Sequence, residues 1–359
     1  ENLVFRNTII DNCEANNGRA FFATAASPNT EFFNFTIQNI KSGNNFIFTL
    51  GHDYVVQEPV KFEQCNFLDC QTNINNNDGG GLGFWCSDEI GIEFNDCTFR
   101  NLIAGKNGGA ISFTQSDGRR NTMVTFARCL FDSNKAGING SALYIDIRAQ
   151  LLITQCNFTY NVGNGNQNGG AIFITERCRN INIERTEFYS NTQSTQSQNN
   201  GNAIYFERQQ ELVGRIYDCK FVDNGNKGSV VYSDGVDLEF ILNTITFTQK
   251  DVGAKGLHVA KSCNVHVANS TFRGCVSNSE GAGFIFDGRN DKSDQGLVTL
   301  ESSTFENNNA TNGCAIYAWL NVNPIIRDVT VRGHKNGNFY VSLFFNHNVE
   351  EDVVIDKCT

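Results

Sequence analysis

Four cysteines recur at one position of a repeated motif: Cys65, Cys97, Cys129 and Cys156 each stand two residues before a phenylalanine. If each lies one turn of the repeat beyond the last, their Cα atoms lie about 4.8 Å apart, the spacing of paired strands. A disulfide accepts that separation, although parallel Cβ vectors disfavour its dihedral angle. Two interpretations therefore remain open, a stack of buried thiols acting as small hydrophobic groups and one or two disulfides between successive repeats. Thirteen cysteines leave an odd thiol, and Cys358 is the candidate for an intermolecular bond.

Asparagine sequons offer a second kind of chemistry. The pattern N-x-[ST] marks acceptors for N-linked glycans in secreted proteins. It occurs at Asn34, Asn139, Asn157, Asn269 and Asn309. Together with the cysteines, these sequons predict an extracellular or cell-surface glycoprotein.

Carboxylates in a catalytic arrangement are harder to find. Glycoside hydrolysis needs two carboxyl groups roughly 5 to 9 Å apart across a cleft. The nearest candidates, Asp132 and Asp223, follow the motif phenylalanines and are separated by intervening repeats that hold Thr159 and Tyr189. We therefore interpret them as solvated turn residues and predict no catalytic residue. No nucleophile elbow and no phosphate-binding loop is present in the sequence.

Metal-binding patterns are equally weak. The five histidines are dispersed, and the cysteines form no C-x-x-C pair. The densest oxygen cluster, Asp287, Asn290, Asp291 and Asp294, lacks the spacing and the closing Glu of an EF-hand. We predict a plain acidic loop there, and neither a metal nor a cofactor.

Composition narrows the class of protein. Lys and Arg number 28 against 38 Asp and Glu, a net charge of −10, which argues against a nucleic-acid partner. No run of 18 apolar residues exists, so no transmembrane helix is predicted. Asparagine and glycine are abundant, and both disfavour helices.

A repeat organises these residues. One block reads small-small-Ala-Ile and continues as an alternating apolar strand, with its clearest copies at residues 108–113, 140–145, 169–174, 201–206 and 313–318. A second block reads Cys/Ser/Thr-x-Phe-x-x-Asn. Its phenylalanines stand about 30 residues apart, at Phe67, Phe99, Phe131, Phe158, Phe188, Phe221, Phe247, Phe272 and Phe305. Ile10 and Ile37 before them and Val331 after them extend the series to about twelve copies.

The period indicates the architecture. Apolar residues alternate with a spacing of two, as in Ile172 and Ile174, which excludes helical repeats. Propeller blades need more residues per repeat. The sequence predicts an all-β fold, a single right-handed parallel β-helix of about twelve coils over residues 1–359, with its hand taken from the preference of parallel crossovers. We expect phenylalanine stacks inside, asparagine ladders in turns and glycine where a corner needs positive φ.

The paired signature, GGAI at residues 108–111 and FxxN at residues 131–134, resembles the repeats of chlamydial polymorphic membrane proteins and their protist relatives. The resemblance covers the chain from about Phe67 to Asn308. It implies a surface-exposed β-helix with roles in adhesion and surface architecture. The sequons and the cysteine column depart from the bacterial proteins, which favours a eukaryotic secreted relative or a fragment of a longer repeat array.

Three functions follow in order of preference. No amphipathic capping helix is evident at either end, so a structural surface protein that assembles with itself end to end is favoured. The alternative is an adhesin that binds glycans or a host surface. Trp85 and Trp319 are its candidate sugar-stacking residues, although both tryptophans lie in strand patterns typical of a core. A polysaccharide lyase or hydrolase ranks third, and we predict that the protein is not an enzyme.

Overall fold

The computed structural model describes most of the chain. It covers residues 3–15, 21–23, 30–43, 47–52, 59–72, 82–86, 91–114, 122–164, 169–194, 201–207, 213–225, 227–248, 253–261, 263–288, 296–320, 324–334, 339–345 and 354–359. Two compact units share these residues. The first is formed by Glu1–Ile181 with Asn191–Thr195, and the second by Asn182–Ser190 with Gln196–Thr359.

Each coil of the first unit has four strand positions, here called A, B, C and D in chain order. Position A holds β1 (Val4–Arg6), β5 (Glu31–Phe33), β9 (Val60–Glu63), β13 (Gly91–Asn95), β17 (Thr122–Ala127) and β21 (Ala149–Thr154). Position B holds β2 (Ile9–Asp11), β6 (Thr36–Gln38), β10 (Asn66–Leu68), β14 (Thr98–Arg100), β18 (Leu130–Asp132) and β22 (Asn157–Thr159). Position C holds β3 (Glu14–Ala15), β7 (Lys41–Ser42), β11 (Gln71–Thr72), β15 (Ile103–Ala104), β19 (Lys135–Ala136), β23 (Val162–Gly163) and β27 (Thr192–Gln193). Position D holds β4 (Phe21–Ala23), β8 (Phe48–His52), β12 (Leu82–Cys86), β16 (Ile111–Thr114), β20 (Leu143–Asp146) and β24 (Ile172–Ile174).

Coils of the second unit have positions A, B and D; β25 (Asn180–Glu184) begins in the first unit and ends in the second. Position A holds β29 (Val213–Tyr217), β32 (Asp237–Ile241), β35 (Val265–Ala268), β38 (Val298–Glu301), β41 (Ile325–Arg327) and β44 (Val354–Asp356). Position B holds β26 (Glu187–Tyr189), β30 (Lys220–Val222), β33 (Thr244–Thr246), β36 (Thr271–Arg273), β39 (Thr304–Glu306) and β42 (Thr330–Arg332). Position D holds β28 (Gly201–Phe206), β31 (Ser229–Asp234), β34 (Lys255–Ala260), β37 (Phe284–Asp287), β40 (Ile316–Leu320) and β43 (Val341–Phe345).

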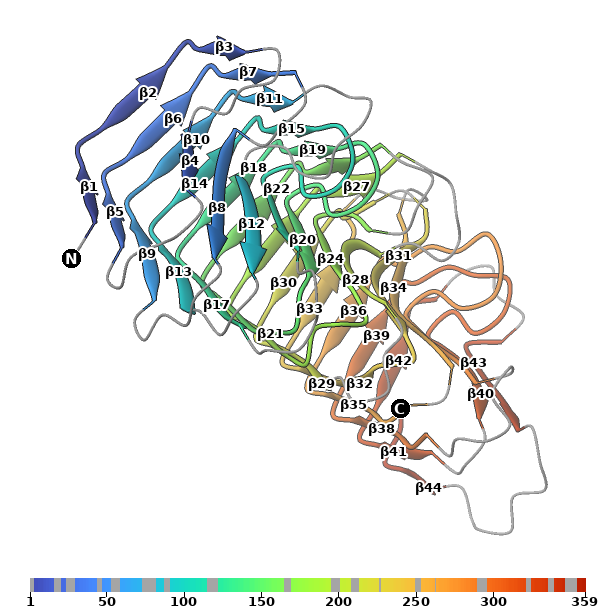
Figure 1. Ribbon diagram of the computed structural model, residues 1–359. Helices are drawn as coiled ribbons and strands as arrows, with labels where there is room; N and C mark the ends of the chain where they lie inside the picture. The colour runs from blue at the N-terminus through green and yellow to red at the C-terminus, as the bar shows by residue number, and fades with distance from the viewer. Residues whose placement is uncertain are drawn as a thin grey trace. The chain divides into compact units, whose positions relative to one another are not determined.

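Strands at one position pair in parallel with their neighbours one coil away (Figure 1). In the first unit β13 pairs with β17 so that Phe94 lies opposite Phe126. Side chains alternate between the core and the outside along each strand: Ile92 and Phe94 are buried, whereas Glu93 between them is half-exposed. The fold is therefore a parallel β-solenoid, and the described residues include no helix.

Phenylalanine stacks fill the interior of the first unit. The rings of Phe32, Phe62 and Phe94 follow one another at 4.6 Å between centroids. Phe131 and Phe158 stack at 4.6 Å at position B. This confirms the expectation that identical side chains fall in columns, an arrangement that adds ring stacking to the burial of apolar area.

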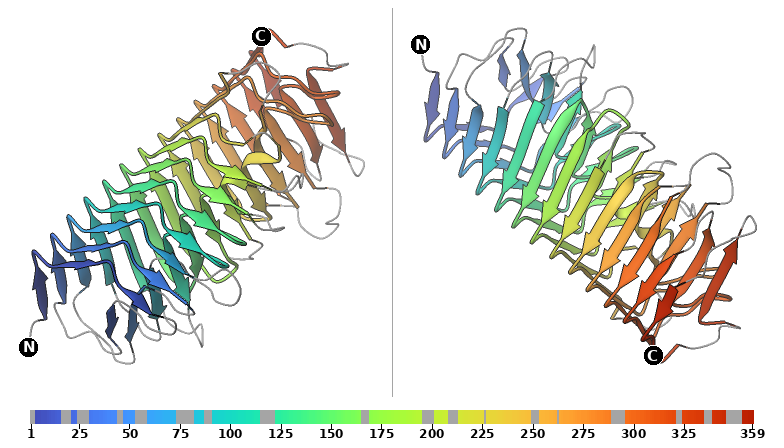
Figure 2. Two further views of the ribbon diagram at one scale, coloured as in Figure 1. Left: turned by 90° about the horizontal axis from the view of Figure 1, so that it is seen from above. Right: turned by 90° about the horizontal axis from the view of Figure 1, so that it is seen from below.

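Strands also stack coil on coil in the second unit (Figure 2). Its phenylalanine column follows the prediction with one correction. Phe188 stacks on Phe221 at 4.8 Å, as predicted. Phe247, however, does not hold the next motif position. Ile245 lies there instead, opposite Phe221 on one side and Phe272 on the other. The register differs because Asn243, rather than a residue nearer Phe247, takes the inward column position that precedes the strand.

Glycine marks the corner before position D, as predicted. Gly108, Gly140 and Gly313 have φ values of 67°, 61° and 62°. A Cβ atom at Gly140 would lie 2.2 Å from the carbonyl oxygen of Leu143. Only glycine adopts this backbone without strain, so GGAI is a corner signature.

Two further corners use residues other than glycine at positive φ. At the A–B corner, between the strands of positions A and B, Asp96, Arg128 and Gln155 all have φ of 54°. Asn101 at the corner between positions B and C, the B–C corner, has the same value. The residue after each of these points inward, and these inward residues form the columns described below.

Counts of strands bear on the predicted number of coils. Over the described residues, positions A, B, C and D hold 13, 12, 7 and 12 strands. Coils with all four strands are thus fewer than the predicted twelve, because the second unit turns from B to D without a C strand. The hand of the solenoid and the single domain over residues 1–359 stay predictions. Among the described residues, no helix is long and apolar enough to cross a membrane.

Candidate functional site

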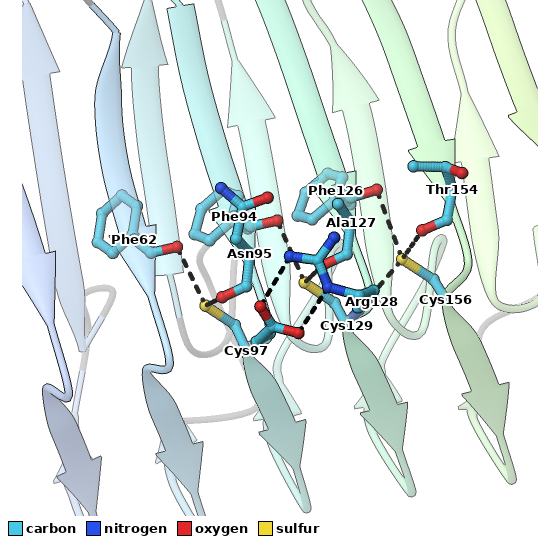
Figure 3. A network of polar contacts seen from close by, with 11 residues as sticks. Phe62, Phe94, Asn95, Cys97, Phe126, Ala127, Arg128, Cys129, Thr154 and Cys156 are labelled. Atoms are coloured by element: carbon cyan, nitrogen blue, oxygen red, sulfur yellow. Dashed lines mark hydrogen bonds and ion pairs between the residues drawn. The ribbon is translucent and has the colours of Figure 1, made fainter.

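The predicted cysteine column lies at the A–B corner of the first unit (Figure 3). Here each thiol lies within hydrogen-bond distance of the carbonyl two residues before it and of a carbonyl one coil back. The Sγ of Cys97 donates to the oxygens of Asn95 and Phe62 at 3.2 and 3.4 Å. Cys129 and Cys156 repeat this pair of contacts. The sulfur also accepts, since the backbone N–H of Cys129 donates to the Sγ of Cys156 at 3.3 Å.

The same corner of the second unit explains which residues the column admits. Cys219 donates through Sγ to the oxygen of Ile183 at 3.4 Å. Asn243 and Ser270 donate to the oxygens of Ile216 and Phe240. Asn243 and Ser270 also accept from the backbone N–H one coil earlier: Cys219 N–H donates to Asn243 Oδ1 at 2.8 Å, and Asn243 N–H to Ser270 Oγ at 3.1 Å. The column therefore selects small side chains that both donate and accept.

These contacts decide between the two interpretations of the cysteines. All twelve cysteines whose side chains are described are free thiols. Burial raises the pKa of Cys129 and Cys156 well above the ordinary value of a thiol. Burial also raises the pKa of Cys219 to about 12. A neutral, buried thiol is neither a nucleophile nor a metal ligand, so the column stabilises the coil stack.

Cys358 occupies a column position at the A–B corner of the second unit. It follows Lys357, whose φ is 49°, and its Sγ donates to the oxygen of Asp356 at 3.4 Å. It is exposed, as is Cys13 at the B–C corner of the first unit. Its proposed role in an intermolecular bond stays a prediction.

Asparagines of the FxxN motif form a second column, at the B–C corner. Asn134, Asn161 and Asn191 of the first unit are fully buried. The Nδ2 of Asn134 donates to Asn161 Oδ1 at 3.0 Å and to the oxygen of Phe99 at 3.0 Å. The backbone N–H of Asn134 donates to the same Asn161 Oδ1 at 3.0 Å. This asparagine column confirms the predicted amide ladder.

The carboxylates considered for catalysis serve as turn acceptors. Asp132, in the first unit, accepts from the Oγ1 of Thr159 at 2.7 Å. Asp223, in the second unit, accepts from the backbone N–H and Oγ1 of Thr248, both at 2.8 Å. Within the described residues no group of three or more His, Cys, Asp or Glu side chains could hold a metal ion. Of the acidic loop, Asn290, Asp291 and Asp294 lie outside the described residues.

Sequence reasoning missed the outer face of position D in the second unit. Tyr205, Tyr232 and His258 point away from the core, yet all three are buried. The two tyrosine rings stack at 5.1 Å, and His258 meets Tyr232 edge-on at 4.9 Å. Burial raises the pKa of Tyr232. Strand alternation alone predicts this column to be exposed, because it carries no sign of what covers the sheet.

An aromatic cluster stands where this face opens to solvent. Trp319 on β40 stacks on Phe344 of β43 at 4.6 Å and is half-buried. Its Nε1 donates to Tyr317 Oη at 3.0 Å, and that hydroxyl donates to the exposed Glu280. Phe344 is 39% exposed, and nearby in the sequence Phe339 and Tyr340 are 63% and 52% exposed. The side chain of Trp85 lies outside the described residues.

The five sequons divide by exposure. Asn34, Asn157 and Asn269 are exposed. Asn309 is half-buried. Asn139 is 6% exposed.

Comparisons with known proteins add no identity. No family model matches the chain, and neither the curated proteins nor the solved structures include a match.

Proposed function

We propose that the protein is a structural β-solenoid of the extracellular space or cell surface that assembles with copies of itself into a longer array. The observation that carries the structural part is the pair of corner columns. The residues whose types and spacing could have done chemistry, the motif cysteines and asparagines, are buried and hydrogen-bonded from coil to coil. Their hydrogen bonds hold successive coils together.

The assembly part concerns the outer edge of β1 and β2. β1 and β2 each pair on one side within the described residues, with β5 and β6. Apolar side chains are exposed on this coil, Ile9 at 67%. An edge with free N–H and C=O groups is a template for another strand. A further coil would satisfy these groups, whether it comes from another copy or from more of the same chain.

The resemblance to chlamydial polymorphic membrane proteins and their protist relatives supports a surface location. It rests on the GGAI and FxxN motifs, which the structure explains as a corner and a column of any such solenoid. It therefore supports the surface location and does not bear on the array.

Electron microscopy of the native protein, combined with thiol labelling, tests the proposal. We expect filaments or arrays with an axial repeat that is a multiple of the coil spacing, about 4.8 Å. Cys358 should lose its reactivity on assembly, because a stacked coil would bury it as the other column cysteines are buried. Met123→Cys, on the exposed face of β17, is the matched control and should stay reactive. Dispersed particles with a reactive Cys358 at high concentration would refute self-assembly.

The cluster of Trp319 and Phe344 favours adhesion as a second candidate function. Aromatic rings can stack on sugar rings while a neighbouring carboxylate accepts hydrogen bonds from the sugar hydroxyl groups. A glycan array probed with the native protein should then show binding that Phe344→Ala weakens tenfold or more. Tyr189→Ala, at an exposed tyrosine of β26, is the control.

A further inference from the structure

The exposed sequons share one place in the coil. Asn34, in the first unit, and Asn269, in the second, are corner residues of the A–B corner, with φ of 48° and 50°. Asn157, in the first unit, begins β22, directly after the column residue Cys156. In each unit the exposed sequons therefore lie at the A–B corner, on the outer side of the cysteine column.

The other two sequons lie elsewhere, and Asn139 is buried whereas Asn309 is half-buried. Asn139 is 6% exposed and precedes Gly140 at the corner before position D. Its backbone is held on both sides, by Asn107 Oδ1 at 3.1 Å and by the N–H of Gly108 at 3.0 Å. The backbone of Asn309 pairs with Cys275 and Ser277 at 2.9 and 2.8 Å. A sugar ring on Asn139 would have to displace packed neighbours, and the half-buried Asn309 leaves less room for one than the exposed sequons do.

We propose that N-linked glycans occupy Asn34, Asn157 and Asn269, that Asn139 and Asn309 stay unmodified, and that the A–B corner is thus the glycan-bearing edge of the coil. This inference rests on the proposed extracellular location. In the reaction, the side-chain amide nitrogen bonds to C1 of an oligosaccharide carried on a lipid pyrophosphate. The nitrogen loses one proton, and the lipid pyrophosphate leaves.

Local geometry accommodates the product. The Nδ2 of Asn34 donates to Asn7 Oδ1 at 2.8 Å and uses one of its two hydrogens, so the substituted amide keeps the other for this contact. The sequon threonines Thr36, Thr159 and Thr271 stand on the outward face of B strands and are half-exposed. A glycan there points sideways from the coil. It leaves the strand edges free to pair, which is what an array requires.

Secretion of the full chain from a eukaryotic cell line tests the inference. Glycopeptide mapping of the folded, protease-resistant fraction should find Asn34, Asn157 and Asn269 occupied. Thr36→Val, Asn157→Gln and Thr271→Val should each remove one glycan. Ser302→Asn is the matched variant that creates a new sequon, Asn-Ser-Thr, with Ser303 and Thr304. Ser302 is an exposed A–B corner residue with φ of 46°. It should add one glycan.

The following three outcomes distinguish failure of this inference from failure of the proposed function. A glycan on Asn139 or Asn309 in folded protein, or an empty A–B corner in secreted protein, would overturn the inference alone. Native protein without glycans, beside recombinant protein with all three, would overturn the extracellular location and the inference with it. Native protein with the three glycans that never assembles would overturn the array and leave the inference standing.

Discussion

The side-chain amide of Asn161 donates to the Oδ1 of Asn191 at 2.9 Å, one coil away in the first unit. The same Nδ2 donates to the oxygen of Phe131, and Asn161 Oδ1 accepts from the backbone N–H of Asn134. One buried side chain thus completes the hydrogen bonding of three coils. Its contribution to stability exceeds that of an isolated hydrogen bond, since its loss leaves several buried groups unsatisfied.

Replacing that amide by a hydrocarbon of similar size should be costly. Asn161→Leu leaves the N–H of Asn134 and the oxygen of Phe131 buried without this partner, so we expect a loss of about 3 to 5 kcal/mol in the free energy of unfolding. Urea denaturation measures it. Asn157→Leu, the same change at an exposed position of β22, should cost less than about 0.5 kcal/mol. Equal losses at the two sites would contradict the ladder's role.

Serine should replace a column cysteine better than valine does. The hydroxyl of Cys129→Ser can donate to the oxygen of Phe94 and accept from a backbone N–H, as Ser270 does in the second unit. Cys129→Val fills the space but can do neither. We expect losses of about 1 and about 2 kcal/mol in the free energy of unfolding. Urea denaturation of both variants tests this, and a more stable valine variant would show that packing alone governs the column.

The GGAI corner should reject a side chain. Gly140→Ala combines a φ of 61° with a Cβ atom 2.2 Å from the oxygen of Leu143. We expect a loss of about 2 to 4 kcal/mol, read from the shift in thermal unfolding. Gln155→Gly, which changes an exposed corner residue with φ of 54°, should alter the stability by less than about 1 kcal/mol. A tolerated alanine at position 140 would mean that the corner relaxes.

Alkaline pH should destabilise the fold through the buried thiols. The pKa values of Cys70, Cys178 and Cys219 are raised by burial to about 12 from an ordinary 9.0. Above pH 9 the unfolded chain therefore releases protons that the folded chain keeps. The contribution of these thiols is fully present below pH 9 and is lost as the pH rises toward 12.

Unfolding curves of single variants across that pH range isolate this effect from the titration of tyrosine and lysine. Cys178→Ser should flatten the fall in unfolding free energy relative to the parent. Cys13→Ser, which removes an exposed thiol, should leave the slope unchanged. Identical slopes for all three proteins would show that the thiols do not control alkaline stability.

Much of this architecture could be predicted because each coil of a solenoid needs similar residue types at the same positions. Phe131 and Phe158, Cys129 and Cys156, and Gly140 all recur in register, and each column shows directly in the motif. The corner residues at positive φ were missed in part for want of a signal: Asn34, Asp96 and Asn101 are of the types that tolerate this conformation, whereas Arg128 and Gln155 are not. Their φ follows from the inward side chain that comes next.

The register at Ile245 could not be predicted for a related reason. Asn243 and Ser270 make the same kind of hydrogen bond in the column as a cysteine does. The sequence motif is therefore hard to recognise where another residue type replaces cysteine. Burial of Tyr232 also left no local signal, because strand alternation alone predicts that an outward side chain is exposed.

Because every coil turns at corners with the same requirements, one coil can be duplicated or lost as a whole. Each corner column requires of a new coil only one inward side chain that donates and accepts, such as Cys156, Ser270 or Asn161. A duplicated stretch of about 30 residues would meet those requirements on both of its faces at once. Such a gene can lengthen or shorten its product by whole coils in a single recombination event, without a second mutation to repair the interior.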